Sequence, residues 1–261
     1  MTRLPRLRWP RGRAKRAFAL TAALVLAVAL SRGRLAGQVR AEGDPRPEAS
    51  SLVRAESSPN GEIEGLRVVV SLDQRLLWAL VGQDTLRTVP VAVASGAVLA
   101  FAGRRWRFNT PRGELAVIGK REQPVWLPPD WHYAEAARDH GLRLRRLAHD
   151  GIRISGGRRL AIRDSVVGLE LPHQGFLPLP VEEHIVFDNT LFIPPLGTRN
   201  RQLSGALGAF ALDLGDGYLL HGTPDPSSIG TATTHGCIRL GREDLDWLYT
   251  HAAVGTPVRI K

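Results

Sequence analysis

The chain has 261 residues, enough for one large domain or two small ones, and 43% of them are hydrophobic, so it can bury a sizeable core. Its formal net charge is +10 at pH 7, yet residues 1–41 hold ten Lys or Arg and no acidic residue, while residues 42–261 balance 25 basic against 25 acidic residues. A protein that binds nucleic-acid phosphates carries its positive charge on the folded domain. The charge distribution therefore argues against nucleic acid as a partner.

The N-terminal segment has the pattern of a secretory signal, because a basic stretch precedes the uncharged residues 17–31 (AFALTAALVLAVALS). This apolar stretch has 15 residues, fewer than the roughly 20 that span a bilayer as a helix. We interpret residues 1–41 as a signal peptide, with residues 39–41 as the best cleavage site, or as an uncleaved membrane anchor through residues 17–31. Both predict export to the periplasm or cell envelope, because an Arg-rich flank stays inside. A cytoplasmic basic tail is the remaining alternative.

A flexible linker is predicted for residues 42–65, which are rich in Glu, Ser, Pro and Gly and have almost no apolar periodicity. The folded domain, residues 66–261, then opens with runs rich in Val, Leu and Thr that are separated by turn-forming residues. The predicted strands are residues 66–71, 76–81, 86–94, 114–119, 159–162, 184–187, 191–193, 210–214, 218–221 and 258–260.

Helical patterns are scarce. Residues 134–140 could make two turns, and residues 243–251 place apolar side chains on one helical stripe. We therefore predict a mostly β fold with a few short helices. Residues 120–195, dense in Pro, Gly, Trp and His, are interpreted as an insertion that forms either a substrate-binding lid or a structural cover. Within it, residues 141–147 alternate apolar and basic side chains, which predicts a solvated or edge strand.

Cys237 is the only cysteine, so it can form no disulfide within the chain. A thiol attacks a carbonyl as its thiolate and needs a nearby base. His235 is two residues away and His221 is 16 residues upstream. Gly236 permits a close backbone approach, which suits an oxyanion hole built from main-chain N–H groups. A buried core thiol is one alternative, and a metal site of His221, His235 and Cys237, completed by Asp225, is another.

The segment from His221 to Arg239 resembles the signature of the YkuD-type L,D-transpeptidases. That signature is a histidine, a spacer of this length, and then Ser or Thr, His, Gly, Cys, an aliphatic residue and Arg or Asn; residues 234–239 (THGCIR) match it throughout. The likeness extends to residues 91–96 (VAVASG) and 110–114 (TPRGE), and to residues 244–258 near the C-terminus. It covers residues 66–119 and 196–261, whereas residues 120–195 are longer than the usual connection in the family.

The resemblance implies a curved, sandwich-like sheet with the cysteine in a groove. In this family pattern Cys237 matches the nucleophile, and His221 matches the general base, whose ring is oriented by the backbone carbonyl of Gly222. His235 would line the site, and backbone N–H groups around Gly236 and Cys237 would hold the oxyanion.

The resemblance also implies peptidoglycan stem peptides as partners and no metal or organic cofactor. Arg239 and Thr234 match substrate-binding positions, although Arg239 could instead form a structural salt bridge. The implied reaction is formation of a Cys237 thioester from a tetrapeptide stem with release of D-alanine, followed by transfer to an amine. Hydrolysis of the same stem peptides, or a non-catalytic wall-binding module on the same fold, are the alternatives.

Overall fold

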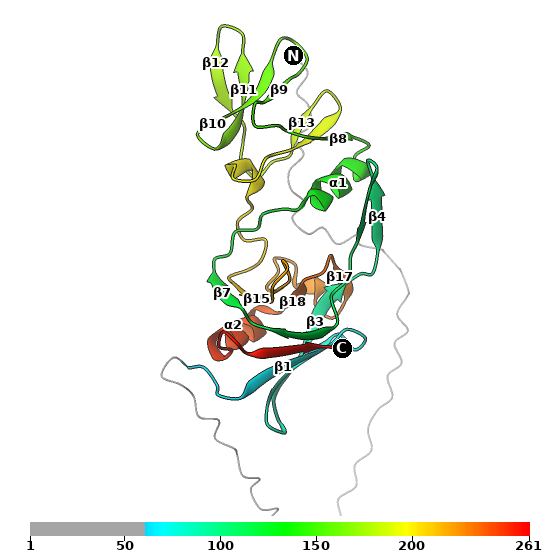
Figure 1. The fold of residues 1–261 in the computed structure, drawn as a ribbon, viewed down its shortest axis with the longest axis vertical. Helices are drawn as coiled ribbons and strands as arrows, with labels where there is room; N and C mark the ends of the chain where they lie inside the picture. Colours follow the sequence, from blue (N-terminus) through cyan, green and yellow to red (C-terminus); the bar gives the residue numbers. More distant parts are fainter. Residues whose placement is uncertain (1–60) are drawn as a thin grey trace, which may run out of the picture. The chain divides into compact units, whose positions relative to one another are not determined.

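The computed structural model describes residues 61–261 (Figure 1). The predicted signal or anchor and nearly all of the predicted linker lie outside these residues, so both stay predictions. In the described part of the chain, no helix has the length and apolar character needed to cross a membrane.

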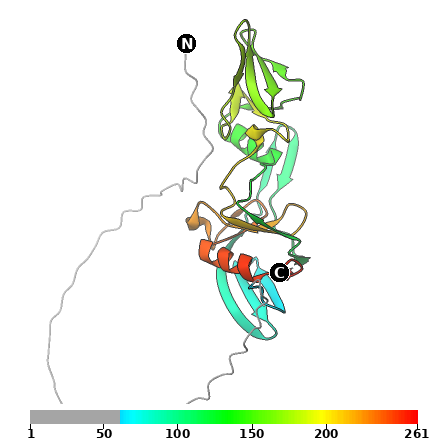
Figure 2. The same ribbon diagram turned by 90° about the vertical axis from the view of Figure 1, so that its left-hand side faces the viewer.

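The largest sheet has the strand order β6-β19-β1-β2-β3-β18-β16-β15-β7, and β17 pairs with β3 beside this path. Its two end strands, β6 and β7, are separated by only two residues in sequence, so residues 113–122 supply both edge strands of the same sheet. This is possible because the sheet is strongly curled, as Figure 2 shows for the strands beside α2. The strands are β1 (Leu66–Ser71), β2 (Leu76–Val81), β3 (Asp84–Ala94), β6 (Gly113–Ala116), β7 (Gly119–Glu122), β15 (Phe210–Asp213), β16 (Leu219–His221), β17 (Ala232–Thr234), β18 (Ile238–Leu240) and β19 (Pro257–Ile260).

The main core lies between this sheet and helix α2 (Arg242–His251). In β1 the side chains of Val68 and Val70 are buried while that of Arg67 is exposed, the alternation expected of a strand with one face on a core. Leu245 and Leu248 form the buried stripe of α2 and are each 1% exposed. Acidic residues in the first turn of α2 favour its start there, because they complement the helix dipole.

The insertion forms two smaller sheets and a helix. A three-stranded sheet has the order β13-β14-β8 and a four-stranded sheet the order β12-β11-β10-β9, while β4 and β5 pair as a hairpin just before the insertion. Helix α1 packs against β14, β8 and β4. The bounds are β4 (Val98–Phe101), β5 (Arg104–Arg107), α1 (Asp130–Asp139), β8 (Arg143–Arg146), β9 (Ile152–Arg153), β10 (Arg159–Arg163), β11 (Val166–Leu171), β12 (Gly175–Pro178), β13 (Ile185–Phe187) and β14 (Thr190–Ile193), with 3-10 turns η1 (Arg199–Arg201) and η2 (Pro226–Ser228).

The predicted mostly β fold class is confirmed, as are the strands at residues 66–71 and 76–81 and the edge position of β8. The single strand predicted at residues 114–119 is wrong, because the chain changes its pairing partner there from β19 to β15. Helix α1 begins four residues before the predicted start at residue 134. Strands β4, β5, β9, β11, β12, β17 and β18 were not predicted; most span two to four residues, too few for a period-2 pattern to show.

Candidate active site

Cys237 and His221 lie on neighbouring strands of the main sheet. β16 and β18 are parallel and in register, with Leu220 opposite Ile238 and His221 opposite Arg239. Cys237 immediately precedes β18, two residues before Arg239, so it belongs to the same face of the sheet as Arg239 and His221.

The half-buried thiol of Cys237 packs against an apolar cluster of Leu207, Ala211 and Leu219, which Trp126 from the insertion also contacts. The Sγ atom lies 3.7 Å from the carbonyl oxygen of Gly217. The cluster thus brings the thiol, strands β15 and β16, and the start of the insertion together at one place.

Burial raises the pKa of the Cys237 thiol above its ordinary value. The backbone N–H of Leu219 and the charge of Arg239 lower this pKa, whereas the carboxylate of Asp213 raises it further, and burial is the largest effect. At neutral pH the unliganded site therefore holds a thiol rather than a thiolate, and attack on a carbonyl requires a base.

His221 is 5% exposed, and its Nδ1 atom is 2.6 Å from the carbonyl oxygen of Gly222. Because a carbonyl oxygen only accepts hydrogen bonds, Nδ1 carries the hydrogen and Nε2 carries a lone pair. Burial, followed by the charge of Arg239, lowers the pKa of His221 to about 4, although the backbone carbonyl groups of Gly222 and Leu207 partly oppose this. The imidazole is therefore neutral at pH 7.

The backbone after His221 is held by a close approach of two glycines. A Cβ atom on Gly222 would lie 3.2 Å from Cα of Gly208 and 3.3 Å from the carbonyl oxygen of Leu207, and the same carbonyl accepts a 2.8 Å hydrogen bond from the Gly222 N–H. There is little room for a side chain here. This contact keeps the Gly222 carbonyl where it meets the His221 ring.

The turn that carries Cys237 is built on two threonine hydroxyls. Thr234 is 1% exposed; its Oγ1 donates to the carbonyl of Cys237 at 2.6 Å and accepts from the N–H of Gly236 at 3.3 Å. Oγ1 of Thr110 donates to the carbonyl of Gly236 at 2.8 Å. Gly236 has φ +151°, and a Cβ there would lie 3.1 Å from the ring of Tyr218. Thr234 is thus engaged with backbone atoms of the turn, and only glycine fits easily at position 236.

His235 is directed toward the insertion. Its ring stacks on that of Trp131, with centroids 4.0 Å apart and an interplanar angle of 11°, and it meets Phe108 edge-on at 4.3 Å. Its Nε2 atom is 3.1 Å from Oε2 of Glu135. Trp131 and Glu135 both belong to α1, so the insertion supplies two of the three side chains that hold the histidine of the signature.

Arg239 carries its charge close to the site. Its guanidinium acts electrostatically on His221, Cys237 and Asp225, and burial lowers its own pKa. Arg239 forms no ion pair with any residue from 61 to 261. Among these same residues, no three His, Cys, Asp or Glu side chains converge where a metal ion could be held.

Phe108, Trp131 and Glu135 were not predicted to belong to the site. Phe108 and Trp131 carry no signal beyond ordinary aromatic content, and Glu135 lies 100 residues before the histidine that it contacts. Thr110 belonged to the TPRGE resemblance, but its hydrogen bond to the turn that carries Cys237 depends on the pairing of β3 with β17 and β18.

Comparison with known proteins identifies the family of the chain. The model of the L,D-transpeptidase catalytic domain family, YkuD, matches residues 65–260. The chain belongs to this family.

Several relatives carry the family name. The probable L,D-transpeptidase ErfK/SrfK of Salmonella typhimurium (strain LT2) is 26% identical over 203 residues, which cover 77% of this chain and 45% of the relative. The probable L,D-transpeptidase YbiS of Escherichia coli (strain K12) is 42% identical over 53 residues, or 20% of this chain and 17% of the relative. Among solved structures, an L,D-transpeptidase from Mycobacterium smegmatis is 18% identical with a TM-score of 0.40, covering 76% of this chain and 58% of that chain. The chain spans a little under half of the length of the Salmonella relative.

Proposed function

We propose that this chain is a peptidoglycan L,D-transpeptidase that works through a thioester on Cys237. The observation that carries the proposal is the pairing of a half-buried thiol with a buried, neutral histidine on the adjoining strand, whose Nδ1 is fixed by Gly222. Membership of the L,D-transpeptidase family supports the choice of stem peptides as substrate.

In the first half-reaction, Nε2 of His221 takes the thiol proton as Sγ of Cys237 attacks the carbonyl of the third residue of a tetrapeptide stem. The bond to D-alanine then breaks, and His221 returns the proton to the leaving amine. In the second half-reaction, an amine from another stem attacks the thioester, loses its proton to His221, and expels the Cys237 sulfur, which takes that proton back. A neutral resting pair suits this sequence, because the base is unprotonated when the substrate arrives.

The other residues of the site support these two. The N–H of Cys237 is our proposed oxyanion donor, since the N–H of Gly236 already points at Thr234. We propose that Thr234 positions the turn, and that Arg239 binds a substrate carboxylate while its charge favours the Cys237 thiolate. His235 is proposed to shape the groove wall with α1.

We further propose that residues 66–261 act in the periplasm or cell envelope, exported by residues 1–41, which serve either as a cleaved signal peptide or as a membrane anchor joined to the domain through residues 42–65. The basic segment before residues 17–31 supports this location.

The test is incubation of the purified chain with tetrapeptide-containing muropeptides, followed by mass analysis of the products. Cross-linked dimers with release of D-alanine support a transpeptidase. Tripeptides alone indicate a hydrolase on the same stems, and unchanged substrate indicates a non-catalytic module. The Cys237→Ala chain is the control and should leave the substrate unchanged.

A further inference from the structure

The insertion contains a small pocket between the edges of its two sheets. β8 is an edge strand of the three-stranded sheet, and β9 is an edge strand of the four-stranded sheet. Residues from both strands line one pocket with a volume of about 240 Å³. The two sheets share an apolar cluster, so their packing brings the two edges together. The pocket is therefore a product of the tertiary structure of the insertion.

Three arginines from the two sheets meet at this pocket. Arg143 and Arg145 are two residues apart on β8, so their side chains lie on the same face of the strand. Arg153 lines the pocket from β9. Asp188 supplies the one carboxylate of the lining. With three positive charges and one negative charge, the lining has a net charge of +2.

The carboxylate of Asp188 is engaged elsewhere. It accepts a hydrogen bond from the N–H of Ser155 at 2.8 Å and another from the Ser155 hydroxyl at 2.5 Å. Arg143 donates to the backbone carbonyl of Asp188 at 2.7 Å. Within residues 61–261, the side chains of Arg145 and Arg153 form no ion pair and no hydrogen bond. Two guanidinium groups of the pocket thus keep all their N–H donors for another partner.

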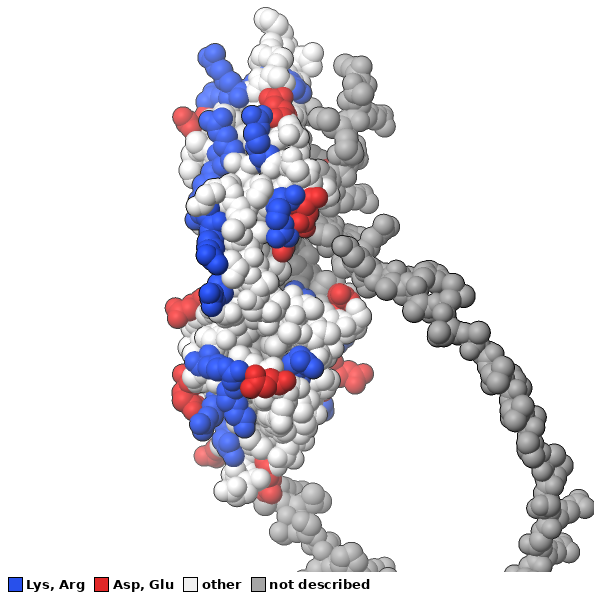
Figure 3. All heavy atoms as spheres, turned by 90° about the vertical axis from the view of Figure 1, so that its right-hand side faces the viewer, with Lys and Arg blue, Asp and Glu red and all other residues white. Residues whose placement is uncertain are grey.

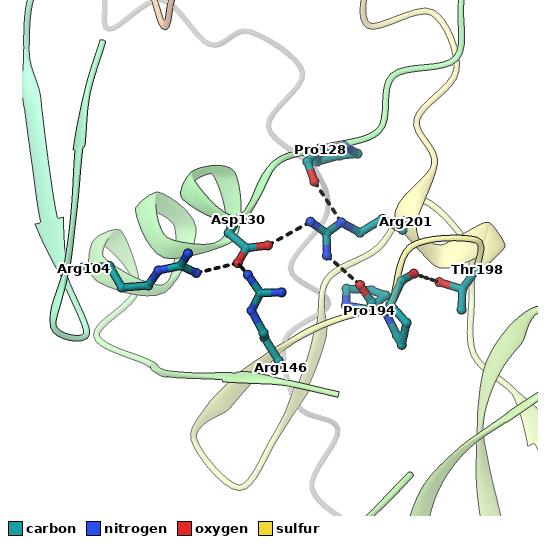
Figure 4. A network of polar contacts seen from close by, with 8 residues as sticks. Arg104, Pro128, Asp130, Arg146, Pro194, Thr198 and Arg201 are labelled. Carbon is teal, nitrogen blue, oxygen red and sulfur yellow. Dashed lines mark hydrogen bonds and ion pairs between the residues drawn. The ribbon is translucent and has the colours of Figure 1, made fainter. Parts of the chain in front are cut away.

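The arginines of a larger cavity in the insertion are, by contrast, already paired (Figure 4). This cavity of about 610 Å³ is lined by Asp130, Arg146 and Arg201. Arg201 donates to Oδ1 of Asp130 at 2.9 Å and to the carbonyl oxygens of two prolines. Arg104 donates to Oδ2 at 2.6 Å, and Arg146 donates to the same oxygen. These arginines hold the start of α1, so they differ from the unpaired arginines between β8 and β9.

The surroundings of the small pocket strengthen its positive potential. Leu144, Ile154 and the buried Phe192 form its apolar walls. A cleft with charges of one sign and walls of low dielectric constant focuses the field on its interior. Figure 3 shows Lys and Arg gathered along one edge of the upper half of the face that it draws, the half in which Figure 1 places β8 and β9. The pocket therefore favours an anion.

A phosphate group matches the charge and the donors of the pocket. A phosphate monoester carries about −1.5 to −2 at pH 7 and has three terminal oxygens. This charge balances the net +2 of the lining, and the oxygens can accept from both unpaired guanidinium groups, which have five N–H donors each. A single carboxylate has about half this charge and two oxygens in one plane.

We propose that the pocket between β8 and β9 is a binding site for a phosphate group, either free phosphate or a monoester such as a lipid headgroup. Arg145 and Arg153 bind the phosphate oxygens from two sides, and Arg143 adds its charge while it stays on the carbonyl of Asp188. The apolar walls contact the carbon atoms of an ester. The inference does not depend on the reaction proposed for Cys237.

Calorimetric titration of the full chain with glycerol 3-phosphate tests the proposal. Arg145→Gln should weaken binding about five- to tenfold, because charge-assisted hydrogen bonds are lost at an exposed site. Arg153→Gln, on the other sheet, should weaken binding by a similar factor, so the test does not depend on the folding of one variant. Arg145→Lys should recover only part of the loss, since an ammonium group lacks the planar fork of a guanidinium.

The matched control is Arg105→Gln, which removes the same charge from an exposed arginine of β5 that does not line the pocket. Arg105 forms no ion pair with any residue from 61 to 261, and its variant should bind as tightly as the parent chain. Residues 1–41 are also basic, but they are identical in every variant, so they do not contribute to the differences. Succinate, a planar dicarboxylate, should bind at least fivefold more weakly than glycerol 3-phosphate.

The proposal is overturned by the absence of saturable binding up to about 10 mM ligand, by an equal loss in Arg105→Gln, or by equal binding of succinate. The arginines would then serve to keep two edge strands from pairing with other chains. Tighter binding of glycerol 3-phosphate than of inorganic phosphate assigns the pocket to an ester, equal binding assigns it to free phosphate, and both results support the site. Acylation of Cys237 by a carbapenem should be unchanged in all these variants, so the pocket and the proposed function can fail separately.

Discussion

Replacing His221 with Gln tests the assignment of the base, because glutamine can keep a hydrogen bond to the Gly222 carbonyl but cannot accept the thiol proton. Burial lowers the pKa of His221 to about 4 and raises the pKa of the Cys237 thiol above its ordinary value. Moving the proton from the thiol to the imidazole in the unliganded site is thus uphill, since burial disfavours the charged form of both groups. The neutral thiol–imidazole pair is therefore the resting form of the site, and we expect proton transfer to accompany attack.

The assay is acylation of the sole cysteine by a carbapenem, followed as the mass shift of the intact protein between pH 3.5 and 9. His221→Gln should slow acylation at pH 7 by a factor on the order of 10² to 10⁴. The rate of the unsubstituted chain should stay level from about pH 5.5 to 8. It should fall as the pH drops through about 4, where His221 becomes protonated and can no longer act as a base. The rate of the variant should instead rise about tenfold per pH unit, because it depends on the free thiolate alone.

Iodoacetamide provides the control, since it alkylates the thiolate and needs no bound carbonyl. Cys237 should react with it more slowly at pH 7 than a free cysteine, and His221→Gln should change this rate little. The reasoning is refuted if acylation in His221→Gln stays within threefold of the unsubstituted chain. It is also refuted if His235→Gln, folded to the same extent, is the variant that loses acylation.

Three further outcomes are expected. Glu135→Gln should change KM with little change in kcat, because Glu135 and His235 shape the groove wall. If His235 acted as an acid or base, the same variant would instead lower carbapenem acylation a few-fold and make it less dependent on pH. Gly222→Ala should lower Tm by several degrees, because its Cβ meets backbone atoms at 3.2–3.3 Å and overpacking of this kind costs about 1–3 kcal/mol. Burial lowers the pKa of His132 to about 3 and that of His184 to about 4. The free energy of unfolding should therefore be level above pH 6.5 and fall as the pH approaches 4, because the unfolded chain takes up these protons first. The loss is about 3 kcal/mol for each of the two histidines.

Each of these has a matched comparison. Gly119→Ala places a Cβ 3.8 Å from its nearest neighbour and should leave Tm almost unchanged; an equal loss in both alanine variants contradicts the packing argument. For Glu135, Asp139 of the same helix contacts Arg138 and not His235, so Asp139→Asn should leave KM unchanged. For His132 and His184, urea unfolding at a series of pH values gives the free energy of unfolding. A curve that stays level down to pH 4.5 would show that the buried histidines are protonated without cost.

The sequence by itself determined the mostly β class, the first two strands and helix α2, and it predicted the segment from His221 to Arg239 as the site. These depend on local information: period-2 alternation in β1 and β2, helical spacing in α2, and a contiguous signature around Cys237. Short strands such as β17 and β18 were missed because three residues carry no period, and their pairing with β3 is made across the sheet.

Only the tertiary structure decided which way the two histidines face. His221 meets a backbone carbonyl next to it in sequence, but its burial depends on the strands packed around it. His235 is held by Trp131 and Glu135, about 100 residues earlier in the chain. The cavity around Asp130 likewise joins three arginines from β5, β8 and η1. Such contacts follow from how separate elements pack, and no pattern along a single segment encodes them.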